Sequence, residues 1–170
     1  MIKTKKTLVG TSPLTLEAAK QWLRITDDPS ADDSLITDLI EQSRDLIEEN
    51  LNIAMVEYSV EIEATERTEL TLPYRPIVSV TQVQDREMND LTYSFNGFAI
   101  SLNSPSDIVA TYTCGYGSSE LPSGLLLGWK EVLTGFYENR GDRMNTDFNP
   151  MILIRQNPVL AAYNKQSWWV

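Results

Sequence analysis

The sequence has no histidine and only one cysteine, Cys114, among its 170 residues. Histidine is the commonest general base and the commonest metal ligand, so its absence removes many catalytic and metal-binding arrangements. A lone cysteine cannot form an internal disulfide, and without histidine it cannot complete a zinc finger or a Cys–His nucleophile. We therefore expect no metal, no cofactor and no nucleophilic active site.

Long apolar runs and basic residues are also scarce. No stretch approaches the roughly 20 apolar residues that a membrane helix needs, and no apolar run follows the first lysines as it would in a signal peptide. Asp and Glu number 24 against 14 Lys and Arg, which gives a formal net charge of −10. Such a surface repels phosphate backbones and anionic membranes, so we expect the protein to bind neither nucleic acid nor anionic membranes tightly. Together with the single cysteine, these features predict a soluble protein that is made in a reducing compartment.

What is present is the composition of an ordinary globular domain, with 42% hydrophobic and 22% charged residues. A chain of this length can bury a core without disulfides. Basic residues gather at the start, at Lys3, Lys5 and Lys6. Three lysines are few for a nucleic-acid-binding arm, so a short solvated arm is the simpler prediction.

Helical periodicity occurs on both sides of a central segment with strand periodicity. It predicts helices over residues 15–25, 31–51 and 122–140, with Thr15 as the cap of the first and with Ser30 and Asp33 at capping-box spacing before the second. Glycines inside the last helix suggest close approach by a packed neighbour. The apolar stripes of the second and third helices predict these core residues: Leu39, Ile40, Ile47, Trp129, Leu133 and Phe136.

The central segment, residues 57–114, alternates apolar and polar residues as half-buried strands do. Asn96-Gly97 lies between two alternating runs and predicts a tight hairpin. The predicted fold class is therefore α+β and mainly helical: two N-terminal helices, an inserted antiparallel β region, one long helix in the C-terminal half, and a C-terminal tail. We expect residues 1–141 to form one domain and residues 142–170 a C-terminal loop and docking tail.

Acidic residues occur in three groups, and each has a simple structural explanation beside a functional one. Asp27, Asp28, Asp32 and Asp33 suit a loop and a helix cap, and they do not match an EF-hand calcium loop. Strand acids at positions 57, 61 and 63 suit a solvated face better than a catalytic dyad. The polar face of the second predicted helix is either solvated or turned toward other subunits or a shared lumen; its acids are Asp38, Glu41, Asp45, Glu48 and Glu49.

The C-terminal tail ends in aromatic residues, which are costly to leave in water and are favoured anchors at interfaces. They either fold back on the chain's own core or dock on a partner. The candidate docking residues are Tyr163, Trp168, Trp169 and Val170.

Five stretches, in order, resemble the head–tail connector proteins (adaptor or head-completion proteins) of long-tailed phages. The resemblance covers residues 12–141, and the segment after Gly141 departs from the family pattern. The stretches are Thr15-Leu16-Glu17-Ala18-Ala19-Lys20 with Leu23-Arg24-Ile25, Asp32-Asp33-Ser34-Leu35-Ile36, Leu72-Pro73-x-x-Pro76, Thr111-Tyr112-Thr113-Cys114-Gly115-Tyr116-Gly117, and Leu121-Pro122 leading to Phe136-Tyr137-Glu138-Asn139-Arg140.

The resemblance implies a non-enzymatic structural protein of the virion neck, made in the cytoplasm of a bacterial host. It implies a homo-oligomeric ring of about twelve copies beneath the portal, which extends the DNA channel and carries the next neck or tail protein. Genomic DNA would pass through without specific binding, and the C-terminal segment would dock on the portal.

Three alternatives compete with this interpretation. One is another neck protein, a stopper or tail-completion protein, although these are usually richer in β-structure. A second is a small acidic hydrolase or lyase that uses carboxylates, which activity screens and perturbed carboxylate pKa values in a cleft would reveal. A third is a monomeric binding module.

Overall fold

The computed structural model describes residues 2–25, 32–117, 120–139 and 149–163. The chain divides into two compact units, each of which draws on two stretches of sequence. The strand unit comprises Met1–Thr11 and Asn52–Ser118, and the helical unit comprises Ser12–Leu51 and Ser119–Val170. The predicted boundary between residues 141 and 142 lies outside the described residues.

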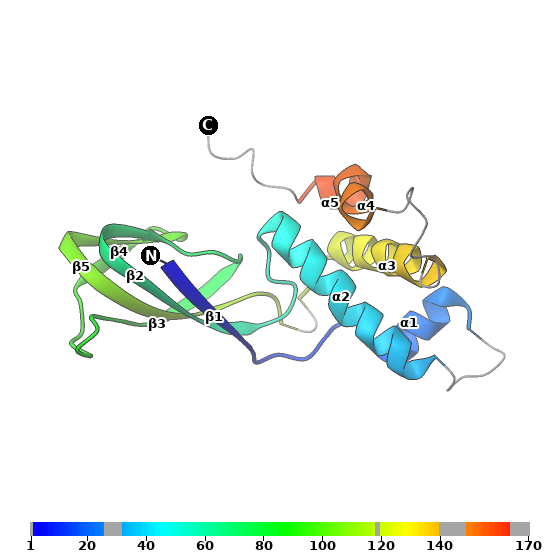
Figure 1. Cartoon of the computed structure of the whole chain (residues 1–170), viewed down its shortest axis with the longest axis horizontal. Helices are drawn as coiled ribbons and strands as arrows, with labels where there is room; N and C mark the ends of the chain where they lie inside the picture. Colours follow the sequence, from blue (N-terminus) through cyan, green and yellow to red (C-terminus); the bar gives the residue numbers. More distant parts are fainter. Residues whose placement is uncertain (1, 26–31, 118–119, 140–148, 164–170) are drawn as a thin grey trace. The chain divides into compact units, whose positions relative to one another are not determined.

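The strand unit is one antiparallel sheet of β1 (Ile2–Leu8), β2 (Tyr58–Thr71), β3 (Ile77–Gln84), β4 (Tyr93–Phe95) and β5 (Ala99–Cys114) (Figure 1). The strand order is β1-β2-β5-β3, and β4 pairs with the first part of β5. Alternate residues of β2 and β5 point into a shared core, for example Val60, Ile62 and Ile108, all at most 1% exposed. The prediction of half-buried strands from the sequence alternation is therefore correct for β2 and β5, each of which buries one face in this core.

The predicted hairpin at Asn96-Gly97 joins β4 to β5. The Asn96 carboxamide oxygen accepts hydrogen bonds from the Phe98 and Ala99 amides, at 3.1 and 2.8 Å. Gly97 has φ +96°, a left-handed conformation that glycine adopts without strain.

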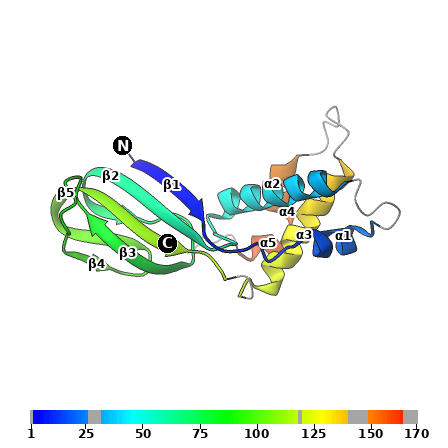
Figure 2. The same ribbon diagram turned by 90° about the horizontal axis from the view of Figure 1, so that it is seen from below.

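The helical unit consists of α1 (Leu16–Leu23), α2 (Asp33–Leu51), α3 (Ser123–Glu138), α4 (Pro150–Gln156) and α5 (Pro158–Ala161). Figures 1 and 2 show α2 and α3 side by side, with α4 and α5 against α3. Thr15 caps α1 as predicted, because its Oγ1 accepts a hydrogen bond from the Ala18 amide at 3.2 Å. Ser30, the predicted first residue of the α2 capping box, lies outside the described residues.

The prediction of a mainly helical fold is wrong. The chain is about 37% helical and 35% strand. The sheet is larger than predicted because β2 continues to Thr71, β5 begins at Ala99, and the N-terminal residues form β1 instead of a solvated arm. Lys3 lies opposite Glu63 and Lys5 opposite Glu61 in the β1–β2 pair, so the lysines complement the acids of the neighbouring strand.

Candidate assembly surface

The predicted core of the helical unit is buried, with one exception. Leu39 and Ile40 are each 6% exposed, and Ile47, Trp129 and Leu133 have no exposed surface. Phe136 is only partly buried. Inside this core, the Trp129 indole N–H donates a hydrogen bond to the Ser43 hydroxyl at 2.9 Å, so both of these buried polar groups have a partner.

The acidic face of α2 is exposed at four of its five predicted positions. Asp38, Glu41, Asp45 and Glu49 lie three or four residues apart, so they form one stripe along the helix, which we call the α2 acidic stripe. Arg44 donates to Asp45 at 2.8 Å, and the Asp45 side chain stays 61% exposed. The Arg44 cation offsets the charge of Asp45, so most of the negative charge of the stripe comes from Asp38, Glu41 and Glu49.

Glu48 departs from the prediction, because it is 1% exposed. It follows Arg44 by four residues, and these two side chains are therefore neighbours at the border between the stripe and the buried face. Arg44 is itself 9% exposed. Glu48 is thus excluded from the exposed stripe, although its sequence spacing places it beside Asp45.

Two acids of the group that precedes and begins α2 have structural partners. Asp32 accepts a hydrogen bond from the Tyr137 hydroxyl at 2.8 Å, and Asp33 forms an ion pair with Lys20, so these residues tie the start of α2 to α3 and α1. Asp27 and Asp28 lie outside the described residues. Within the described ranges, no group of three or more acidic or cysteine side chains is placed to hold a metal ion.

The C-terminal segment packs on glycines of α3. A Cβ atom at Gly128 would lie 2.4 Å from Leu160 Cδ2, and one at Gly124 would lie 2.7 Å from the Tyr163 hydroxyl. The expected close approach is thus present at Gly124 and Gly128, and the side chains that approach belong to Leu160 of α5 and to Tyr163 beyond it. Tyr163, a candidate docking residue, contacts the chain's own α3; Trp168, Trp169 and Val170 lie outside the described residues.

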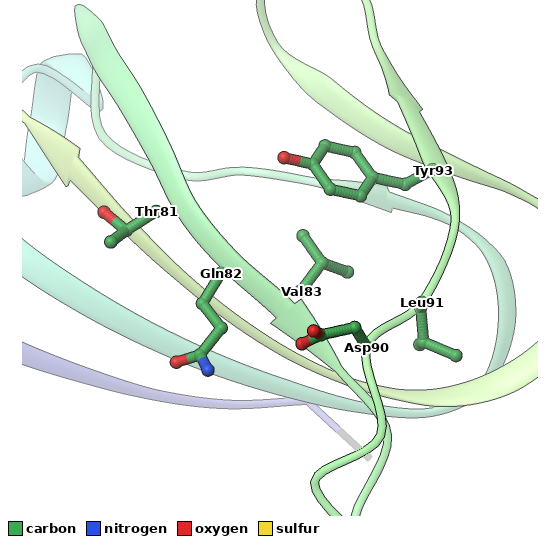
Figure 3. Close-up of a pocket in the computed structure, with 6 residues that line it drawn as sticks. All are labelled: Thr81, Gln82, Val83, Asp90, Leu91 and Tyr93. Carbon is green, nitrogen blue, oxygen red and sulfur yellow. The ribbon is translucent and has the colours of Figure 1, made fainter.

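One pocket in the strand unit lies between β3 and the segment that leads into β4 (Figure 3). A single acid, Asp90, faces it, and this carboxylate accepts a hydrogen bond from Gln84 Nε2 at 2.9 Å. The lining has no second acid and no base, so it lacks the paired groups of acid–base catalysis. Its residues are Thr81, Gln82, Val83, Asp90, Leu91 and Tyr93.

Sequence reasoning missed β1 and the surface that it forms. Ile2 and Leu8, at its two ends, are 54% and 51% exposed, and Val78 of β3 is 62% exposed. The sequence feature that could have indicated β1 is the charge match between its lysines and the glutamates at positions 61 and 63. This match becomes visible only when the register of the two strands is known. None of the helices in the described ranges is long and apolar enough to cross a membrane.

Comparison with known proteins adds a family and a fold. No curated protein matches the chain. Among solved structures, a chain from the neck of an empty gene transfer agent (GTA) particle, computed with C6 symmetry, superposes with a TM-score of 0.71 at 16% identity, over 96% of this chain and 94% of that one.

Two further structures share this fold. A chain from the virion of a native GTA particle gives a TM-score of 0.65 at 18% identity, over 87% of this chain and 92% of that one. A chain from the neck of a native GTA particle, computed with C12 symmetry, gives 0.66 at 15% identity, over 94% of each chain. A family model for the phage gp6-like head-tail connector protein matches residues 13–150, so the chain belongs to that family.

Proposed function

We propose that copies of this connector protein form a ring of about twelve beneath the portal, where they extend the DNA channel and join the head to the tail. The family match over residues 13–150 is the observation that carries the proposal. It favours a connector over a stopper or tail-completion protein, and it gives no support to a carboxylate hydrolase. The protein therefore acts as a structural component of the virion neck and not as an enzyme.

The ring itself is supported by the shared fold. Two of the similar chains come from necks computed with C6 and C12 symmetry. Cyclic closure requires that one face of each subunit meets a different face of the next. The portal on one side and the next neck or tail protein on the other complete the proposed set of partners.

Electron microscopy and native mass spectrometry of the purified protein, alone and mixed with its portal, test the ring. We expect closed rings in at least one of the two samples. A protein that remains a monomer in both samples, at every concentration tried, would contradict the proposal.

We further propose that the α2 acidic stripe faces the channel. Twelve copies would carry a total charge of about −120 from the net charge of −10 each, and acids along the lumen would repel passing DNA and keep it from adhering. The four exposed residues carry this role, and the buried Glu48 does not.

Charge reversal tests the stripe in assembled particles. The variant Asp38→Lys, Glu41→Lys, Asp45→Lys and Glu49→Lys is expected to slow DNA ejection, with the larger effect at low salt, where charges are less screened. A matched control reverses four exposed glutamates that lie outside the stripe and outside the sheet edges, namely Glu66, Glu69, Glu120 and Glu138. The control is expected to eject DNA at the parent rate; equal kinetics for the two variants would remove the stripe from the channel.

A further inference from the structure

The sheet of the strand unit has two edges. In the order β1-β2-β5-β3, β1 ends one side and β3 ends the other. Within the described chain, no strand pairs with the outer edge of β1, and the outer edge of β3 meets only the loop at its end, where the Leu91 amide donates to the Val83 carbonyl at 3.0 Å. Such edges offer rows of backbone donors and acceptors to another strand.

The β3 edge is little protected against pairing. Its eight residues include no charge and no proline, and Val78 is 62% exposed. Soluble proteins usually protect an edge strand with lysine, proline or a bulge. Here the protection consists of two irregularities in the pairing of β3 with β5 and of the loop that pairs with Val83 and Gln84 at one end of the strand.

The β1 edge has the opposite character. Three of its seven residues are lysines, and two of these, Lys3 and Lys5, are exposed. Two β1 strands side by side would place like charges opposite one another, which is destabilising. The lysines therefore disfavour pairing of β1 with β1 and leave an acidic or neutral edge as the suitable partner.

The end of β3 supplies acids. Asp85, Glu87 and Asp90 lie in the loop after it, and Arg86 of the same loop is paired with Asp107 at 3.1 Å. Figure 3 shows the Asp90 carboxylate in the pocket beside β3, close to apolar side chains of the same lining. A lysine from an added strand could lay its methylene stem along those apolar groups and bring its ammonium to the carboxylate.

From this complementarity we infer that β1 of one copy pairs with the outer edge of β3 in the next copy, so that the sheet continues across the subunit interface. β1 has seven residues, and β3 leaves residues 77–82 open for pairing, because the following loop already pairs with Val83 and Gln84. Because β1 and β3 are different surfaces of one chain, the contact is heterologous, as ring closure requires. The inference rests on the proposed ring and specifies which surfaces meet in it.

Disulfide trapping between two single-site variants of the full chain tests the pairing. One variant carries Thr4→Cys or Thr7→Cys in β1, and the other carries Ser79→Cys or Thr81→Cys in β3; all four positions are exposed. Paired strands bring Cα atoms to about 4.5–5.5 Å, within the range that a disulfide spans. The native Cys114 is fully buried, so the parent chain serves as the background.

We expect covalent dimers in equimolar mixtures of a β1 variant with a β3 variant, and none in either variant alone. Thr68→Cys, at an exposed position of β2, replaces the β3 variant in the control mixture and should give no dimer. Electron microscopy of the same samples separates the two proposals. If rings form without the β1–β3 disulfide, the strand pairing is overturned and the ring proposal stands. If neither the rings nor the disulfide forms, both proposals are overturned. Dimers of the β1 variant by itself, or equal dimer in the control mixture, would also overturn the pairing.

Discussion

Replacing Gly128 by alanine is the most direct test of how the C-terminal segment is held. Leu160 of α5 is fully buried, and its Cδ2 and Cγ atoms would lie 2.4 and 2.6 Å from a Cβ at position 128. Rotation of the leucine tip alone cannot relieve both contacts, because Cγ is fixed close to the α5 backbone. Gly128→Ala should therefore push α5 away from α3.

Two effects of opposite sign determine how much Gly128→Ala changes the free energy of unfolding. Alanine in place of glycine in a helix interior stabilises by about 1 kcal/mol. Forcing an extra methyl group into a packed core costs about 1–3 kcal/mol. With both near the middle of their ranges, the free energy of unfolding of the helical unit should fall by about 1 kcal/mol.

Urea unfolding followed by far-ultraviolet circular dichroism measures this change, and a double-mutant cycle with Leu160→Ala supplies the control. The leucine truncation alone should cost about 2–5 kcal/mol, because it leaves a cavity. In the double variant the added methyl group occupies part of that cavity, so the combined loss should be smaller than the sum of the single losses by about 1 kcal/mol or more. A Gly128→Ala variant more stable than the parent, or strictly additive losses, would refute the packing argument.

Two further predictions concern buried polar groups. Ser43→Ala should cost about 1–3 kcal/mol in urea unfolding, because it leaves the Trp129 indole N–H buried without its acceptor, and adding Trp129→Phe should recover part of that loss. The buried Tyr112 hydroxyl donates to the Pro73 carbonyl, and burial raises the pKa of Tyr112 above its ordinary value. Above pH ~10 the unfolded chain therefore loses this proton more readily than the folded chain. The free energy of unfolding should be retained below that pH and fall above it, and the fall should be smaller in Tyr112→Phe.

Elements governed by local rules were predictable from the sequence. Thr15 begins α1 because a threonine before an apolar stripe supplies the acceptor that the first helical amides lack. The Asn96-Gly97 turn follows in the same way from the conformations that those two residues tolerate. Core residues of α2 and α3 were predictable because a periodic apolar stripe has one face to bury.

Features set by long-range partners were not predictable. Whether Lys3 and Lys5 form an arm or a strand depends on Glu61 and Glu63, which lie more than fifty residues away in the chain and meet them only in the β1–β2 register. Glu48 shows the same limit within one helix. Helical spacing assigns it to the acidic face, but the width of the buried face depends on what packs there, and that width decides its burial.

The cost of burying charge also bears on the α2 acidic stripe, for which the sequence left open a contact with other subunits or a position in a shared lumen. This cost favours the position in solvent. If Asp38, Glu41 and Glu49 were sealed in an interface between copies, each unpaired carboxylate would cost several kcal/mol of desolvation, and a neighbour would have to supply matching cations. A stripe that lines a water-filled channel loses no hydration and keeps its repulsion toward DNA. The electrostatics are therefore best satisfied when the subunits meet through other surfaces, such as the edges of the sheet, and leave the stripe in solvent.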